Sequence, residues 1–192
     1  MSEKSSITKE IAVLHLKIMT MAIFVAVFGF FSGNGSFAFA QGPVAITAAE
    51  VPFEIAYPAS WYARRETTPQ TEAYFFTREP VDTPTSRYLV GISVQVIYGQ
   101  VAVIGDWESF KTSQRDFFSR EHSGSKELSD LTVDGFVAFG FEFAAQESTT
   151  RMAYVKKGND LVVIIMEAPA AEWVTFEPTY AASLRDFKFK NK

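Results

Sequence analysis

The chain has 192 residues, 18 of them basic and 22 acidic, and its formal net charge at pH 7 is −4. An acidic chain without a lysine- or arginine-rich cluster is poorly suited to nucleic acid, because that binding depends on neutralising phosphates. The absence of cysteine excludes disulfides, thiolate metal sites, cysteine nucleophiles, iron–sulfur clusters and a lipid attached to an N-terminal cysteine.

The N-terminal residues have the features of a secretory signal peptide. Three lysines precede an uncharged apolar run over residues 18–31, and the small residues Ala38 and Ala40 follow a glycine-containing break. This order predicts a signal peptide over residues 1–40, cleaved after Ala40. A retained anchor is the alternative, because residues 11–31 are long enough to span a bilayer and only one histidine and one lysine interrupt them.

Cleavage would leave 152 residues (192 minus 40), with 15 basic and 20 acidic side chains and a net charge near −5. A chain of this length forms one ordinary domain. We expect a short N-terminal segment over residues 41–52 and a single domain over residues 53–190. The 19 Phe, seven Tyr and three Trp of the chain can supply its core, because each buried ring removes a large area from water.

Alternation of apolar and polar residues predicts four strands in the first half of the domain. Pro58 ends the first strand, and two prolines among residues 79–87 indicate an exposed loop. In the fourth strand one set of alternate residues is apolar throughout and is expected to face the core. The strands are expected over residues 53–57, 61–65, 73–77 and 88–98, and the core-facing set is Tyr88, Val90, Ile92, Val94, Val96 and Tyr98.

The spacing then changes to that of a helix. Asp106 is a good N-terminal cap, and the core-facing side chains after it recur at intervals of three and four residues. The helix is expected to end near His122, and its core-facing residues are Trp107, Phe110, Gln114, Phe117 and Phe118.

The second half returns to strands. Asp134-Gly135 is a strong two-residue hairpin signal, and residues 146–150 are expected to form a polar turn. The apolar run at residues 161–167 predicts a strand buried on both faces in the middle of a sheet, since an exposed edge of this composition would aggregate. The four strands are expected over residues 128–133, 136–145, 151–156 and 161–167.

A second helix closes the chain. Trp173, Phe176, Tyr180 and Leu184 share one helical face, and Pro178 either begins the main helical segment or kinks it. Residues 187–189 can form a short final strand. Because hairpins dominate, the predicted fold class is α+β, a mainly antiparallel sheet covered by two amphipathic helices.

Several of these segments resemble PsbP-like domains. Residues 53–61 match the F-x-I-x-Y-P-x-x-W opening of that family, and residues 134–135, 157–159, 163–173 and 183–187 resemble its closing half. The resemblance covers most of residues 51–189 and implies an α/β/α sandwich. It rests on turns and core aromatics, so it specifies fold better than function.

The resemblance also implies a function. Photosynthetic members of the family are non-enzymatic extrinsic subunits on the lumenal side of photosystem II, where they support calcium and chloride retention; other relatives include a nuclear Ran-binding branch and small bacterial envelope proteins. The signal peptide argues against the nuclear branch, and its composition is unlike a chloroplast transit peptide. We therefore expect an exported bacterial accessory protein of the periplasm, extracellular space or thylakoid lumen, without a cofactor, docking on a protein partner at a membrane surface. Any calcium role is expected to be indirect.

No residue is assigned a catalytic, cofactor-binding or metal-binding role. His122, the only histidine after residue 40, is read as a helix-end residue, since a cation is favoured there, and no G-x-S-x-G motif accompanies it. No calcium-binding D-x-D-x-D-G loop is present. The enzymatic alternative is an exported hydrolase in which Glu142 and Glu167 share a cleft, although Glu142 is expected to point to solvent.

Two further features concern binding. Trp61-Tyr62 with Arg64-Arg65 could stack on bases or sugars, but Trp61 is expected at the edge of the core and the arginines in water. The Pro80–Pro84 loop is a candidate contact surface, because loops on a rigid sheet often carry recognition. A small-ligand carrier, with a pocket between sheet and helix, is a third alternative.

Overall fold

The computed structural model describes residues 44–45, 51–81, 88–145 and 147–190. The predicted signal peptide, its cleavage site and the alternative anchor lie outside these residues. So do most of the segment over residues 41–52 and part of the predicted loop, residues 82–87.

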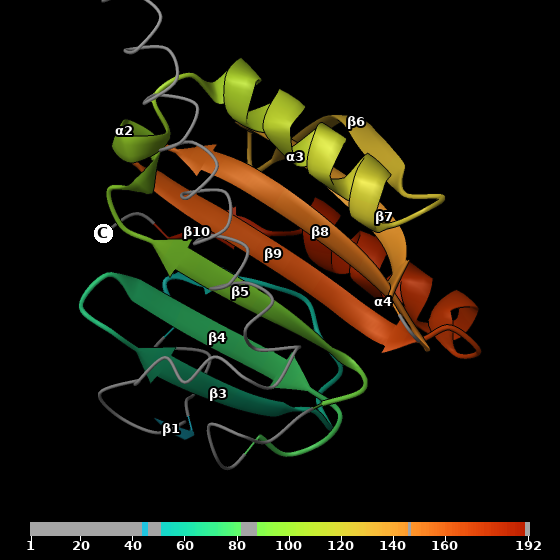
Figure 1. Ribbon diagram of the computed structural model, residues 1–192. Coiled ribbons are helices and arrows are strands. Elements are labelled where there is room, and N and C mark those ends of the chain that lie inside the picture. The colour runs from blue at the N-terminus through green and yellow to red at the C-terminus, as the bar shows by residue number, and fades with distance from the viewer. Residues whose placement is uncertain (1–43, 46–50, 82–87, 146, 191–192) are drawn as a thin grey trace, which may run out of the picture. The chain divides into compact units, whose positions relative to one another are not determined.

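The domain is built on an eight-stranded sheet in which every neighbouring pair is antiparallel (Figure 1). This confirms the antiparallel sheet predicted from the hairpins. In spatial order the strands are β1 (Val44–Ala45), β3 (Tyr62–Thr67), β4 (Thr71–Thr77), β5 (Gly91–Ile97), β9 (Asp160–Pro169), β8 (Ser148–Lys157), β7 (Phe136–Ala145) and β6 (Lys126–Val133).

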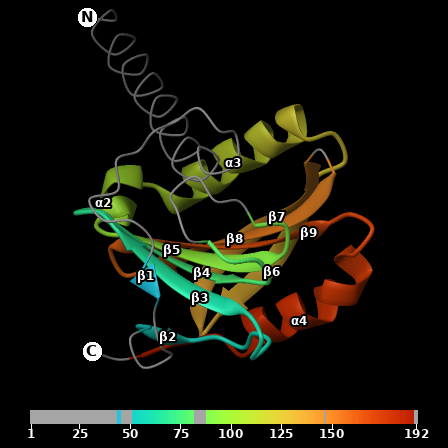
Figure 2. The same ribbon diagram turned by 90° about the horizontal axis from the view of Figure 1, so that it is seen from below.

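Helices cover both faces of this sheet. α3 (Trp107–Glu121) lies on one face and α4 (Trp173–Arg185) on the other (Figure 2). A short helix that the sequence did not reveal, α2 (Gln100–Ile104), connects β5 to α3. The predicted α+β class and its α/β/α layering are therefore confirmed.

α3 is held to the sheet by aromatic packing. The carboxylate of Asp106 accepts a hydrogen bond from the backbone N–H of Ser109 at 2.9 Å and caps the helix as predicted. Phe118 stacks on Phe141 with 4.5 Å between ring centroids, and Phe110 meets Phe139 edge-to-face at 5.7 Å. Burying each of these rings stabilises the fold by roughly 2–3 kcal/mol, since each is almost fully removed from water.

α4 is fixed to the opposite face by buried hydroxyl groups. Tyr180 donates a hydrogen bond to the carbonyl of Glu167 in β9, and Ser183 donates one to the carbonyl of Ala56. Pro178 lies inside the helix rather than at its first turn, so one backbone hydrogen bond is missing there.

Beside α4, β2 (Phe53–Glu54) pairs with β10 (Lys188–Phe189) in a separate two-stranded sheet. The predicted final strand is confirmed, but the strand predicted over residues 53–57 is too long. Its partner offers only two residues, and the carbonyl of Ala56 bonds to a serine hydroxyl instead of a neighbouring strand. Phe53 stacks on Phe187 with 5.0 Å between centroids, which joins this small sheet to the core.

Two other expectations for the strands are wrong. β5 is shorter than residues 88–98, its polar Ser93 and Gln95 are buried, and Tyr98 is exposed. The prediction from periodicity supposed that one face of the strand is in contact with water, whereas β5 is an interior strand that is buried on both faces. β8 begins at Ser148, so residues 148–150 belong to a strand rather than to the predicted turn, because they pair with both β7 and β9.

Candidate functional site

The two carboxylates of the enzymatic alternative lie on opposite faces of the sheet. Glu142 is paired with Arg151, and Arg151 with Met166; paired residues of antiparallel strands point to the same face. Glu167 follows Met166 in β9 and therefore points to the other face. The shared cleft required by a paired-carboxylate hydrolase is not formed.

Glu142 is instead part of an ion-pair cluster, which corrects the expectation that it points freely to solvent. Its carboxylate lies 2.5 Å from the guanidinium of Arg151, which also reaches Glu177 in α4 at 3.1 Å and covers the ring of Trp173 at 5.4 Å. A carboxylate held this way serves structure, since a general acid must be able to gain and lose its proton during a reaction.

His122 occupies the helix end at which it was predicted. It is the C-terminal cap of α3, its backbone N–H donates to the carbonyl of Phe118, and its ring lies 4.3 Å from that of Phe143. Among the described residues no three His, Asp or Glu side chains form a metal-binding group. In the same part of the chain, no helix has both the length and the apolar character needed to cross a membrane.

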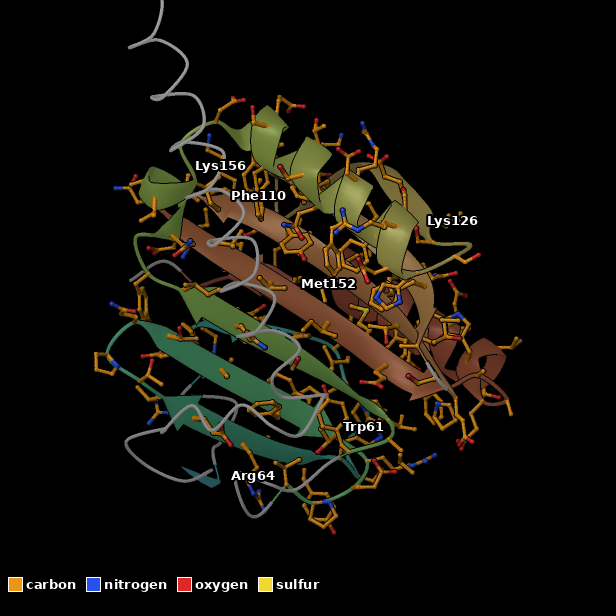
Figure 3. The ribbon with its side chains drawn as sticks, viewed as in Figure 1. Trp61, Arg64, Phe110, Lys126, Met152 and Lys156 are labelled. Carbon is orange, nitrogen blue, oxygen red and sulfur yellow. The ribbon has the colours of Figure 1, made fainter. Side chains whose placement is uncertain are left out.

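The aromatic–arginine segment of β3 is divided between core and surface. Trp61 is buried against Phe176 of α4, with ring centroids 6.2 Å apart, as expected for a residue at the core edge. Tyr62 is exposed, and the guanidinium of Arg64 lies 5.7 Å from its ring. Figure 3 shows Trp61 and Lys156 at opposite ends of the sheet. The end near Trp61 carries the features described next.

An arginine bridge joins the connection between β4 and β5 to the start of α4. The guanidinium of Arg78 lies 2.8 Å from the carboxylate of Glu79 and 2.6 Å from that of Glu172, the residue preceding α4. It also stacks over the ring of Phe176 at 5.6 Å. These contacts hold two segments 94 residues apart in the sequence against each other.

Glu79 also fixes the far end of the same connection. Its second carboxylate oxygen accepts hydrogen bonds from the backbone N–H groups of Leu89 and Val90, both at 3.1 Å. Although burial of Glu79 acts to raise its pKa, the hydrogen bonds from Arg78 and from these N–H groups together lower it. The carboxylate is therefore ionised at neutral pH and holds Leu89 in place.

Large apolar side chains are exposed to solvent next to both ends of this bridge. Leu89 is 61% exposed and Val174, in the first turn of α4, is 83% exposed. Tyr62, across from Thr77 in the sheet, adds a third side chain at 42%. We call the group formed by Tyr62, Arg78, Glu79, Leu89, Glu172 and Val174 the loop-end surface.

This end of the domain carries charges of both signs. Among the described residues, seven glutamates and five basic side chains lie at or next to it. The glutamates are Glu79, Glu121, Glu142, Glu147, Glu167, Glu172 and Glu177, and the basic residues are Arg64, Arg78, Arg120, Lys126 and Arg151.

A polar stripe lies on the α3-facing side of β3, β4 and β5, beyond the strands that α3 contacts. Glu66 is only 2% exposed, and one of its carboxylate oxygens has no hydrogen-bond partner. Burial raises the pKa of Glu66 to about 7, because a carboxylate is disfavoured away from water. Burial likewise raises the pKa of Glu167 on this face, partly offset by a hydrogen bond from Ser148.

The contact surface predicted on the Pro80–Pro84 loop stays a prediction, because residues 82–84 lie outside the described part of the chain. The sequence did not indicate the residues of the loop-end surface. Leu89 was grouped with the polar side of a strand, and Val174 carried no signal beyond its position between the core residues of a helix. Arg78 and Glu172 are too far apart in the sequence for any local pattern to pair them. An exposed apolar residue beside such a bridge becomes visible only once the chain is folded.

Comparison with known proteins gives matches to solved structures alone. No protein-family profile matches the sequence, and no curated protein matches it. The solution structure of cyanobacterial PsbP (CyanoP) from Synechocystis sp. PCC 6803 is 12% identical, with a TM-score of 0.45 over 82% of this chain and 99% of that one. A PsbP is thus among the structures that match.

Two further structures match at similar levels. One is a protein of unknown function, PA94 from Pseudomonas aeruginosa, described as a putative regulator, with 11% identity and a TM-score of 0.40 over 67% of this chain and 91% of that one. The other is LpqN, involved in cell envelope biogenesis of Mycobacterium tuberculosis, with 11% identity and a TM-score of 0.39 over 78% and 91%. All three likenesses concern the fold alone.

Proposed function

We propose that this chain is a non-enzymatic, exported accessory protein that docks on a protein partner at a membrane surface, and that it does so through the loop-end surface. The observation that carries the proposal is the exposure of Leu89 and Val174 next to the two ends of an ion-paired bridge, Leu89 bonded through its N–H to Glu79 and Val174 two residues after Glu172. Burying such side chains against a partner removes apolar surface from water and favours association.

The remaining features agree with a binding role. The carboxylate pair of the hydrolase alternative is split between two faces, and the aromatic rings of both helices are used in packing against the sheet. The resemblance of residues 53–61 and the closing half to PsbP-like domains supports docking on a membrane complex, with photosystem II as one such complex. The leader over residues 1–40 supports export.

The test compares charged substitutions at the two ends of the sheet. The purified full-length protein is immobilised and incubated with detergent-solubilised membranes from the source organism, and retained proteins are identified by mass spectrometry. Leu89→Glu should reduce retention of the partner at least tenfold. Val137→Glu is the matched control, because Val137 is 60% exposed on β7 at the other end.

Two results would count against the proposal. Equal retention of the same protein by wild type and Leu89→Glu would remove the loop-end surface as the docking site. Hydrolytic turnover by the purified protein, abolished by Glu142→Gln or Glu167→Gln without loss of stability, would replace the accessory role by an enzymatic one.

A further inference from the structure

We propose that the buried carboxyl group of Glu66 and the side chain of Gln95 form a binding site for a small primary ammonium ion. The site lies on the α3-facing side of β3, β4 and β5 and includes no residue of the loop-end surface, so it goes beyond the proposed function and is independent of it. Two observations carry it, which are a buried carboxylate oxygen without a partner and a pairing register that places a second polar side chain on the same face.

Glu66 lacks a hydrogen-bond donor. The residue is 2% exposed, and one of its carboxylate oxygens accepts no hydrogen bond. Buried polar groups are almost always paired, because an unpaired group has lost its contacts with water and gained nothing in return. An oxygen in this state marks a place where a donor from outside the chain would be held.

The arginine that shares this face of β3 does not supply the donor. Arg64 lies two residues before Glu66 and therefore points to the same side of the sheet. Its guanidinium donates to the carbonyl of Ala63 at 3.0 Å and lies 5.7 Å from the ring of Tyr62. Burial raises the pKa of Glu66 to about 7, and no basic side chain of the described residues offsets that rise.

The register of the sheet brings Gln95 to the same site. Glu66 pairs with Ala73 of β4, and Ala73 pairs with Gln95 of β5, the next strand in Figure 1. Paired residues of antiparallel strands point to one face, so Glu66 and Gln95 flank Ala73. The side chain of Ala73 ends at Cβ and leaves no long side chain between them. Gln95 is also 2% exposed, and its amide oxygen is an acceptor.

One nitrogen atom can contact both side chains. The backbones of β3 and β5 are about 10 Å apart, because neighbouring strands are separated by roughly 4.8 Å. Two hydrogen bonds from an ammonium group span about 5.6 Å of that distance. Glu66 and Gln95 then need to lean toward Ala73 by only about 2 Å each to complete the contact.

The two acceptors determine the class of ligand. An ammonium group supplies the positive charge that Glu66 lacks, and it has three N–H donors to share between a carboxylate and an amide oxygen. Calcium and magnesium need about six oxygen ligands, and within the described chain no three His, Asp or Glu side chains are grouped to hold a metal. Glu66 lies three residues before the exposed Pro69 of the β3–β4 hairpin, which gives a small amine a short path from solvent.

The experiment titrates isotope-labelled full-length protein with methylammonium chloride and follows its amide signals by NMR. The side-chain amide of Gln95 and the backbone N–H of Ala73 should shift and reach saturation. Tetramethylammonium chloride carries the same charge without an N–H donor, so it should cause no saturable shift at these positions.

Substitutions supply the second readout. Glu66→Gln should weaken methylammonium binding at least tenfold, because it removes a charge-assisted hydrogen bond. Glu108→Gln, at an exposed position of α3, is the matched control and should leave the affinity unchanged. Gln95→Met keeps the approximate size of the side chain, removes its acceptor and should weaken binding several-fold. Thermal melting checks that each variant is folded.

Three results would overturn the site. Absence of a saturable shift with methylammonium would mean that Glu66 is satisfied by its own proton or by water alone. Equal shifts with tetramethylammonium would mean that no hydrogen bond is donated, and unchanged affinity in folded Glu66→Gln would place the ion elsewhere. None of these results bears on the loop-end surface, which is tested by retention of the partner with Leu89→Glu.

Discussion

The buried carboxyl of Glu66 makes the stability of the fold depend on pH in a direction opposite to that of most carboxylates. Burial raises its pKa in the folded protein to about 7, against an ordinary pKa of 4.5 for the exposed group. Below pH 4.5 both states are protonated and the difference has no effect. Between pH 4.5 and 7 the unfolded chain releases this proton while the folded one keeps it, so stability falls as the pH rises and levels off above pH 7.

The size of the effect follows from the shift. One pKa unit corresponds to about 1.4 kcal/mol, so a difference of about 2.5 units gives an upper value of roughly 3 kcal/mol in the free energy of unfolding. Glu66→Gln keeps the shape of the side chain and removes the titration. Burying the amide changes the free energy of unfolding of the variant by an amount that does not vary with pH. The test is therefore how the difference in unfolding free energy between variant and wild type changes with pH, and not its value at any single pH.

The measurement is urea unfolding of wild type and Glu66→Gln at several pH values between 4.5 and 8. The variant should gain roughly 3 kcal/mol relative to wild type across this range. Glu108→Gln, at an exposed position of α3, reports the effect of the same substitution away from the core. A difference between Glu66→Gln and wild type that stays flat with pH would refute the reasoning.

Three other substitutions test the packing. Gly140→Ala should destabilise the fold by about 2 kcal/mol or more, because its methyl group would meet the carbonyl of Met152 at 2.2 Å and force β7 and β8 apart; wild-type stability in urea would contradict the register of these strands. Asp106→Ala should lower the melting temperature by a few degrees through loss of the helix cap, and Asp106→Asn should restore most of that loss. Arg78→Gln should cost at most about 1 kcal/mol, since its ion pairs are partly exposed, yet should raise hydrogen exchange at Leu89; unchanged exchange would mean that the bridge does not order the connection.

Local signals in the sequence were sufficient wherever neighbouring residues determine the structure. Asp134 and Gly135 both adopt positive φ in the predicted hairpin, Asp106 caps α3, and the alternation of Phe139, Phe141 and Phe143 places all three under that helix. Each of these depends on residues only a few positions apart.

Long-range pairing was beyond such signals. β2 is only two residues long because its partner β10, which is more than 130 positions away in the sequence but adjacent in space, offers only two residues. Ser93 and Gln95 were assigned to a solvated face because their polarity is visible in the sequence, whereas the neighbours that enclose β5 are not. Glu142 and Glu167 point to opposite faces of the sheet because of the pairing register of β7, β8 and β9. The sequence of one strand does not specify that register.

The position of β9 in the middle of the sheet has a consequence for how this protein folds after synthesis. β9 is the last strand of the large sheet along the chain, yet it is inserted between β5 and β8, both of which precede it. Chains emerge from their N-terminal side, so this apolar strand is made after both of the strands with which it pairs. In the folded sheet both of its edges are hydrogen-bonded, so it offers no open edge to which another copy could add a strand.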